Sequence, residues 1–239
     1  MAQLVVVDNK NHLNLKIDTN KAEQHGAKLN LVPAVMSEFI NMAVQYPLVI
    51  TKNAETGQFV FAAMLGFEVG ENLFWRDEQW QGLYLPLQIR RQPFFVSNND
   101  NNTDKGNYVV CFDRDSPTIS PEGEQAIFDE QGEETEYFQQ AKACLAQLLR
   151  GEIDNQRLLA NLEKMALLQV MKMEITFANQ QATTLNGLYT IDQEKLASLS
   201  ADNIATLHSE GHLQAIYTLI TSLGQMHQLI DLKNKKFGG

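Results

Sequence analysis

The 239-residue chain has little cysteine, a shortage of basic residues and no long apolar run. Its two cysteines, Cys111 and Cys144, lie in segments of different character and outside any C-x-x-C pair, which favours reduced packing residues over a disulfide. No stretch approaches the roughly 18 apolar residues that a membrane-spanning helix needs. Asp8 interrupts the short apolar stretch at the N-terminus, so we recognise no secretory signal. We therefore expect a cytoplasmic globular protein without membrane insertion.

The chain also has few basic residues relative to its acidic ones. The chain has 19 Lys and Arg against 29 Asp and Glu, a net charge of -10, whereas nucleic acid or anionic lipid as the main partner would need a basic surface. Acidity concentrates in residues 121–150, which carry seven acidic and two basic residues. A solvated acidic face, or a patch that meets a basic partner, is expected there. The carboxylates that could gather around a cation lack the loop spacing of a calcium-binding hand; they are Asp113, Asp115, Glu122 and Glu124.

The order of periodic segments predicts an α+β protein with a β-rich part at about 30–120 and a helix-rich part at about 133–234. The strands should form a largely antiparallel sheet, built mainly by residues 48–112, with helices packed on one face. The acidic stretch contains no Pro-, Ser- or Gly-rich tether, so we expect a single domain over residues 1–239.

Local signals set the expected elements of the first half. A short helix over 35–45 should stop at Tyr46-Pro47, because proline cannot continue a helix. Alternating or continuous apolar runs between turn residues mark the strands. The expected strands are 48–50, 59–65, 94–96, 108–110, 171–177 and 184–191.

Helical spacing governs the second half. An apolar face over 137–149 should end at Gly151, and Asp154 can cap a second helix. Asp192 and Ser200 are predicted caps of two short helices. A final helix from about 212 to 233 should bury Leu213, Ile216, Tyr217, Ile220, Leu223, His227 and Ile230.

Residues 70–95 concentrate both tryptophans, an Arg-Arg pair and many aromatics. If 76–79 form a four-residue hairpin loop, Trp75 and Trp80 face each other across two strands. Alternation along the second strand then separates a core side from an outer side, which we call the aromatic face. Because Pro86 cannot donate to a ladder, this strand either lies at an edge or breaks there, and a break would change the alternation beyond it. The core side holds Gln81, Leu83, Leu85, Leu87 and Ile89. The aromatic face holds Trp80, Gly82, Tyr84, Pro86, Gln88 and Arg90, with Glu71 roughly opposite Tyr84.

The aromatic face allows two interpretations. It can bind a flat or apolar ligand, with Arg90 or Arg91 fixing a carboxylate. Alternatively, the C-terminal helices cover it and the tryptophans belong to the core, which is the commoner role of large aromatics. Arg91 falls on the core side, so the two arginines should differ in role. The candidate ligand-binding residues are Trp75, Trp80, Tyr84, Arg90, Arg91 and Glu71.

No other motif carries chemistry. His208 and His212 have a spacing that suits one metal ion on a helix, but Gly211 should separate two helices there, and HSEGH does not match the H-E-x-x-H zinc pattern. The chain has no G-x-S-x-G and no phosphate-cradling glycine loop. We therefore name no catalytic residue, no cofactor and no metal site.

The order of the motifs resembles the bacterial SapC family over about residues 30–232. The family's name derives from an association with surface-layer formation, some descriptions attach it to peptide transport, and its members occur beside tryptophan-halogenase-like proteins. The resemblance therefore implies an accessory role beside such systems or an unassigned enzyme role; the lack of a membrane helix argues against a permease. The blocks that carry the resemblance are Tyr46-Pro47-Leu48-Val49-Ile50, Leu65-Gly66, Gly70-Glu71-Asn72-Leu73-Phe74, Trp80, Tyr84-Leu85-Pro86, Ile89-Arg90-Arg91, Pro93-Phe94, Ala126-Ile127-Phe128-Asp129, Leu188-Tyr189-Thr190-Ile191-Asp192, Lys195-Leu196, Gly211-His212-Leu213 and Ser222-Leu223.

Two functional hypotheses follow. The first, preferred, is a non-catalytic binding or accessory protein that engages a peptide or protein partner through the aromatic face, with the acidic segment tuning partner choice. The alternative is an enzyme or cofactor-dependent modifier with a pocket between sheet and helices, in which Arg90 or Arg91 anchors an anion and His212 or Glu71 transfers a proton. A homo-oligomer formed through an aromatic edge strand is compatible with either.

Overall fold

The computed structural model describes residues 3–98 and 108–238, and the chain divides into two compact units. Unit 1 comprises Met1–Gly26 and Leu87–Leu149, and unit 2 comprises Ala27–Pro86 and Arg150–Gly239. Each unit is thus assembled from two stretches that are distant in the sequence. The expectation of a single domain over residues 1–239 stays a prediction.

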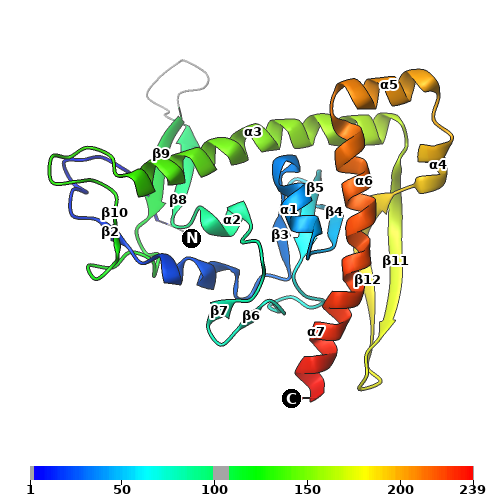
Figure 1. Ribbon diagram of the computed structural model, residues 1–239, viewed down its shortest axis with the longest axis horizontal. Coiled ribbons are helices and arrows are strands. Elements are labelled where there is room, and N and C mark those ends of the chain that lie inside the picture. Colours follow the sequence, from blue (N-terminus) through cyan, green and yellow to red (C-terminus); the bar gives the residue numbers. More distant parts are fainter. Residues whose placement is uncertain (1–2, 99–107, 239) are drawn as a thin grey trace. The chain divides into compact units, whose positions relative to one another are not determined.

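The predicted α+β class is confirmed, since antiparallel sheets combine with helices that dominate the C-terminal part (Figure 1). In unit 1, β9 pairs with β1 on one side and β8 on the other, and β10 pairs with β2. A cluster around Phe94, Phe112, Phe128 and Phe138 forms its core. The elements of unit 1 are β1 (Leu4–Val6), β2 (Lys16–Ile17), η1 (Thr19–Lys21), η2 (Glu23–Gly26), α2 (Leu87–Arg90), β8 (Phe94–Asn98), β9 (Tyr108–Asp113), β10 (Gln125–Ala126) and the beginning of α3 (Glu136–Lys164).

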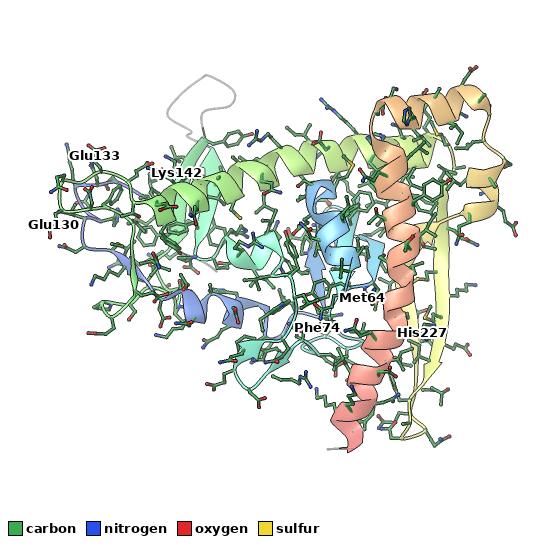
Figure 2. The ribbon with its side chains drawn as sticks, viewed as in Figure 1. Met64, Phe74, Glu130, Glu133, Lys142 and His227 are labelled. Atoms are coloured by element: carbon green, nitrogen blue, oxygen red, sulfur yellow. The ribbon has the colours of Figure 1, made fainter. Side chains whose placement is uncertain are left out.

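Unit 2 is built on a five-stranded antiparallel sheet in the order β11-β12-β4-β5-β3. Helix α6 packs on β12 and β4, and α1 contacts both α6 and β4. Met64 and Phe74, labelled in Figure 2, lie in its interior. Its elements are β3 (Leu31–Pro33), η3 (Met36–Glu38), α1 (Phe39–Ala43), β4 (Leu48–Lys52), β5 (Phe59–Met64), β6 (Trp75–Arg76), β7 (Gln79–Trp80), the end of α3, β11 (Leu168–Thr176), β12 (Ala182–Ile191), α4 (Gln193–Ala197), α5 (Ala201–Ser209), α6 (His212–Ser222), η4 (Leu223–Gln225) and α7 (Met226–Gly238).

Elements with strong local signals lie where the sequence predicts them. The helix before Tyr46-Pro47 stops, and β4 begins directly after it at Leu48. The Asp192 side chain accepts a hydrogen bond from the Lys195 amide, and Ser200 caps α5 in the same way. The strands expected at 94–96 and 108–110 are present and pair as β8 with β9, and those expected at 171–177 and 184–191 pair as β11 with β12, the second pair with a bulge.

The predicted helix stop at Gly151 is wrong, because α3 runs without interruption through that position. Gly151 is buried, and a Cβ atom built on it would lie 2.5 Å from the Val35 Cβ. Asn155, one turn further on, accepts from the Met36 amide at 2.8 Å and donates to the Ala34 carbonyl at 2.9 Å. The glycine therefore permits close packing of α3 on residues 34–36 and does not end the helix.

We expect Gly151→Ala to destabilise the protein by about 1–3 kcal/mol, since overpacking outweighs the gain of about 0.5–1 kcal/mol in helix propensity. Chemical denaturation measures the change. In a Val35→Ala background the same substitution should be clearly milder, because the methyl group then has room. Equal effects in the two backgrounds would contradict the packing role of Gly151.

The predicted buried faces of two helical segments are rotated in the structure. Tyr217 and His227 are exposed, although both were expected in the core (Figure 2 labels His227), and η4 divides the expected final helix into α6 and α7. In the segment predicted as a helix over 35–45, the apolar residues Ile40 and Val44 also face outward. Ile216 is buried as expected, and so is Phe39 of the first segment. The other buried residues of the two segments are Met42, His212, Ala215, Leu219, Ser222, Met226, Leu229 and Lys233.

Candidate functional site

The tryptophan hairpin of unit 2 has the predicted pairing, with Trp75 opposite Trp80. The connection is shorter than expected, because Arg76 pairs with Gln79 and leaves a two-residue turn at Asp77 and Glu78. Both turn residues have positive φ angles, 53° and 57°. This combination is typical of a type I′ turn, whose twist suits a tight hairpin.

The predicted continuation of the second strand through residue 90 is wrong. Strand β7 ends at Trp80, an irregular loop follows, and Leu87–Arg90 form helix α2. Leu83, expected in the core, is 85% exposed. Its amide donates to the Gln45 side-chain oxygen at 2.6 Å, so a side chain takes the place of a neighbouring strand.

A hydrogen-bonded network, which we call the clasp, fixes this loop to the segment around α1. The Tyr46 hydroxyl donates to the Tyr84 carbonyl at 2.6 Å and accepts from the Trp80 indole nitrogen at 3.1 Å. The Tyr84 hydroxyl donates to the Glu38 carboxylate at 3.1 Å. The clasp comprises Glu38, Gln45, Tyr46, Trp80 and Tyr84.

The clasp is largely inside unit 2. Glu38 and Tyr46 are fully buried, and Trp80 and Tyr84 are half-buried. Burial raises the pKa of the Tyr46 hydroxyl, and the hydrogen bond from Trp80 opposes this only in part. The polar atoms by which Trp80 and Tyr84 would recognise a ligand thus bond within the protein. Ligand binding by the aromatic face stays a prediction.

Glu71 belongs to a separate ion-pair cluster in unit 2. Its carboxylate accepts from Lys233 at 2.7 Å, from Lys236 at 3.2 Å and from the Phe67 amide at 3.1 Å. Burial alone would raise the pKa of Glu71, but the bonds from Lys233 and Phe67 outweigh it and hold the pKa below its ordinary value. These bonds suit a structural role, in which Glu71 holds α7 in place, better than a role in proton transfer.

The two arginines lie in unit 1, whereas the other candidate residues lie in unit 2. Arg91 bonds to Gln88 at 2.8 Å and to the Phe94 carbonyl at 2.8 Å, and its guanidinium stacks 4.3 Å from the centre of the Phe95 ring. Burial lowers the pKa of Arg91. Arg90 is exposed at the end of α2. The two arginines thus differ in exposure. Their predicted difference in role and their joint role in one site stay predictions.

The histidine pair is separated as expected. Gly211, with a φ angle of 74°, lies between α5 and α6. His212 is buried, with its Nδ1 atom 3.0 Å from the Asn161 amide nitrogen and 3.2 Å from the Glu210 carboxylate. Burial lowers the pKa of His212, and the negative charge of Glu210 opposes this effect. Within residues 3–98 and 108–238, no group of three His, Cys, Asp or Glu side chains is placed to hold a metal ion.

The acidic segment lies in unit 1. Glu130 and Glu133, labelled in Figure 2, are exposed, and Lys142 forms an ion pair with Glu134 at 2.7 Å. Glu133, Glu134 and Lys142 line part of a hollow of about 540 Å³. This placement fits a solvated acidic face.

A second hollow, which sequence reasoning missed, lies in unit 2 between the β4–β5 hairpin and α3. Its volume is about 550 Å³, within the range of small-ligand and peptide sites. We call it the Lys52 groove. The only sequence signal was the turn at 53–57, which brings the ends of β4 and β5 together; the approach of α3 depends on tertiary packing. The groove is lined by Lys52, Gly57, Gln58, Phe59, Gln156, Leu159, Ala160 and Glu163.

The Lys52 groove carries opposite charges on its two walls. The Lys52 ammonium lies 5.0 Å from the centre of the Phe59 ring and 6.0 Å from that of Tyr189. These two rings meet edge to face at 4.9 Å. Glu163 supplies a carboxylate from α3, and among the described residues neither Lys52 nor Glu163 has an ion-pair partner.

Comparison with known proteins gives one match. The family model described as SapC matches residues 7–229. No curated protein and no solved structure matches the chain. Over the part of the chain that the structure describes, no helix is long and apolar enough to cross a membrane.

Proposed function

Since the chain belongs to the SapC family, we propose that it is a non-catalytic binding or accessory protein that holds a peptide segment of a partner protein in the Lys52 groove. It would act in the cytoplasm, beside the surface-layer, transport or tryptophan-halogenase-like systems with which the family is associated. The observation that carries the proposal is the groove itself, which combines the Lys52 ammonium and the Glu163 carboxylate, neither ion-paired within the described residues, with the amides of Gln58 and Gln156 and the apolar side chains of Phe59 and Leu159.

The chemistry of the groove suits a peptide. The side-chain amides of Gln58 and Gln156 each offer two N–H donors and a carbonyl acceptor, which match the alternating acceptors and donors of a peptide backbone. Phe59 and Leu159 provide apolar contact for a side chain. Lys52 can meet a carboxylate and Glu163 an amine, so a peptide carrying both charges fits best.

The aromatic face is the second location for a partner. Trp75, which pairs with Trp80 of that face, is half-buried and takes part in no clasp bond, so its ring is available for contact with a partner. The enzyme alternative receives less support, because Glu71 and His212 line neither the Lys52 groove nor the hollow in unit 1, and each bonds to its own neighbours.

Selection from a random peptide library tests the proposal. We expect wild-type protein to enrich peptides that carry both an acidic and a basic group, and Lys52→Glu to weaken their binding by about tenfold or more, the loss of one charge-assisted hydrogen bond. Lys172→Glu makes the same charge change at an exposed position of β11 outside the groove and should leave affinity unchanged.

The control variants distinguish the two locations. If the selected peptides bind Lys52→Glu normally and lose affinity with Trp75→Ala, the peptide site is the aromatic face and the groove assignment is wrong. Failure to enrich any peptide would oppose a peptide-binding function at either location.

A further inference from the structure

A third surface in unit 2, formed by α1 and α6, differs from the rest of this acidic chain in having no charged residues. The two helices pack side by side (Figure 1) and enclose a shallow hollow of about 360 Å³. Its lining is apolar or neutral and includes Ile40 from α1, Val44 directly after α1, and Gln214, Tyr217 and Thr218 from α6. We call this surface the α1/α6 face.

The α1/α6 face has no formal charge. Residues 39–51 and 211–230 contain no Asp, Glu, Lys or Arg, although charged residues make up 20% of the chain. Exposed helix faces normally carry charged side chains, so contact with solvent alone does not explain why charged residues are absent here. Depletion of charge together with exposed aromatic and aliphatic residues is the composition of the core of a protein interface.

Large apolar side chains project from this face. Ile40 is 55% exposed, Val44 61% and Tyr217 56%. These residues line the hollow that lies between them. A patch that carries both projections and a hollow can be complementary to a copy of itself, because a twofold axis brings the projections of one copy against the hollow of the other.

We infer that the α1/α6 face is the surface through which two copies of this chain associate. Each copy carries a net charge of -10, so two copies repel each other at long range. Contact through the α1/α6 face adds no close like-charge pair to this repulsion, because residues 39–51 and 211–230 carry no Asp, Glu, Lys or Arg. Its neutral polar groups, such as Gln214 and Thr218, are both donors and acceptors and can pair across a twofold axis. A basic partner would gain no electrostatic attraction here.

This inference is independent of the peptide proposal, because the α1/α6 face shares no lining residue with the Lys52 groove. Sedimentation equilibrium on the full chain tests it. We expect wild-type protein to approach twice the chain mass of 27.0 kDa in the micromolar range. The dimer should be stronger in high salt, since salt screens the repulsion between two acidic copies.

Two substitutions place a charge inside the expected interface. Val44→Glu and, as an independent second variant, Tyr217→Lys should raise the dimer Kd by about tenfold or more, because a buried charge would lack a partner. Both positions are exposed in the single chain, so the thermal midpoint of a monomeric sample should change little. Leu83→Glu, at an apolar residue 85% exposed outside this face, is the matched control and should still dimerise.

The outcomes are decisive in both directions. Dimeric wild type and control with monomeric, folded Val44→Glu or Tyr217→Lys support the inference. A wild type that stays monomeric at high concentration and high salt overturns it, as does a dimer that neither substitution weakens.

Discussion

Replacing Lys233 by methionine should lower the free energy of unfolding by about 3–5 kcal/mol, the typical effect of removing one partner from a buried ion pair. The Lys233 side chain is 5% exposed and lies 2.7 Å from the Glu71 carboxylate and 3.0 Å from that of Glu68. The Phe177 and Phe237 rings lie within 6 Å of its ammonium, at 5.8 Å and 5.2 Å. Without Lys233, the more distant Lys236 is the one cationic partner that the described residues leave to the buried Glu71 carboxylate.

Lys236→Met is the matched control for this experiment. It removes a cation from the same carboxylate, but the Lys236 side chain is 62% exposed, and exposed ion pairs contribute at most about 1 kcal/mol. Urea denaturation of both variants gives the comparison. Equal effects of the two substitutions would contradict the assignment of Lys233 as the buried fastening of α7.

The same ion pair predicts how stability depends on pH. Burial alone would lower the pKa of Lys233, but the hydrogen bonds that its ammonium donates to the Glu71 and Glu68 carboxylates raise the pKa above the ordinary value of 10.5, and the pKa of Glu71 lies below 4.5. The contribution of Lys233 to the free energy of unfolding is therefore fully present below about pH 10.5 and is lost as pH rises through its folded-state pKa. The contribution of Glu71 is complete above about pH 4.5 and is lost as pH falls through its folded-state pKa. Thermal midpoints of Lys233→Met should lack the alkaline loss that wild type shows.

Gly82→Ala should lower stability by about 3 kcal/mol or more, at the upper end of overpacking effects. A Cβ atom at Gly82 would overlap the Tyr46 hydroxyl and the Trp80 indole nitrogen. Tyr46 is fully buried and its ring packs against Phe74 at 4.8 Å, so it has no room to move. The substitution therefore opens the clasp and releases the loop after β7.

Tryptophan fluorescence provides a local measurement of this opening. Both tryptophans of the chain lie in the β6–β7 hairpin, so the emission reports on the clasp, and Gly82→Ala should shift it to longer wavelength. Gly224→Ala is the control, because a Cβ there meets no atom within 4 Å. A Gly82→Ala protein with wild-type stability and emission would mean that the clasp is loose, and that Trp80 and Tyr84 remain available to a ligand.

The clasp limits the role that the aromatic face can have. The sequence places Trp80 and Tyr84 on one side of a strand, whereas the structure places them in an irregular loop whose polar groups bond to Tyr46 and Glu38. The pairing of Trp75 with Trp80 could be predicted because a tight turn fixes its own register. The partners of their side chains could not, since Tyr46 and Glu38 lie 34 and 46 positions away in the sequence from Trp80 and Tyr84 respectively.

The sequence by itself determined the features that depend on neighbouring residues. These are the stop at Tyr46-Pro47, the caps at Asp192 and Ser200, the alternation along β11 and the SapC family membership. Such features follow from backbone sterics, hydrogen bonds over three or four residues and the two-residue period of a strand.

Only the tertiary structure decided which faces are covered. Gly151 is a packing residue because Val35 approaches it, and Glu71 is a buried ion-pair partner because Lys233, 162 positions later, reaches it. Helical periodicity identifies an apolar stripe but not its neighbours, so it placed Tyr217 in the core although no described element covers it. The physical reason is that burial depends on long-range packing, which local spacing does not encode.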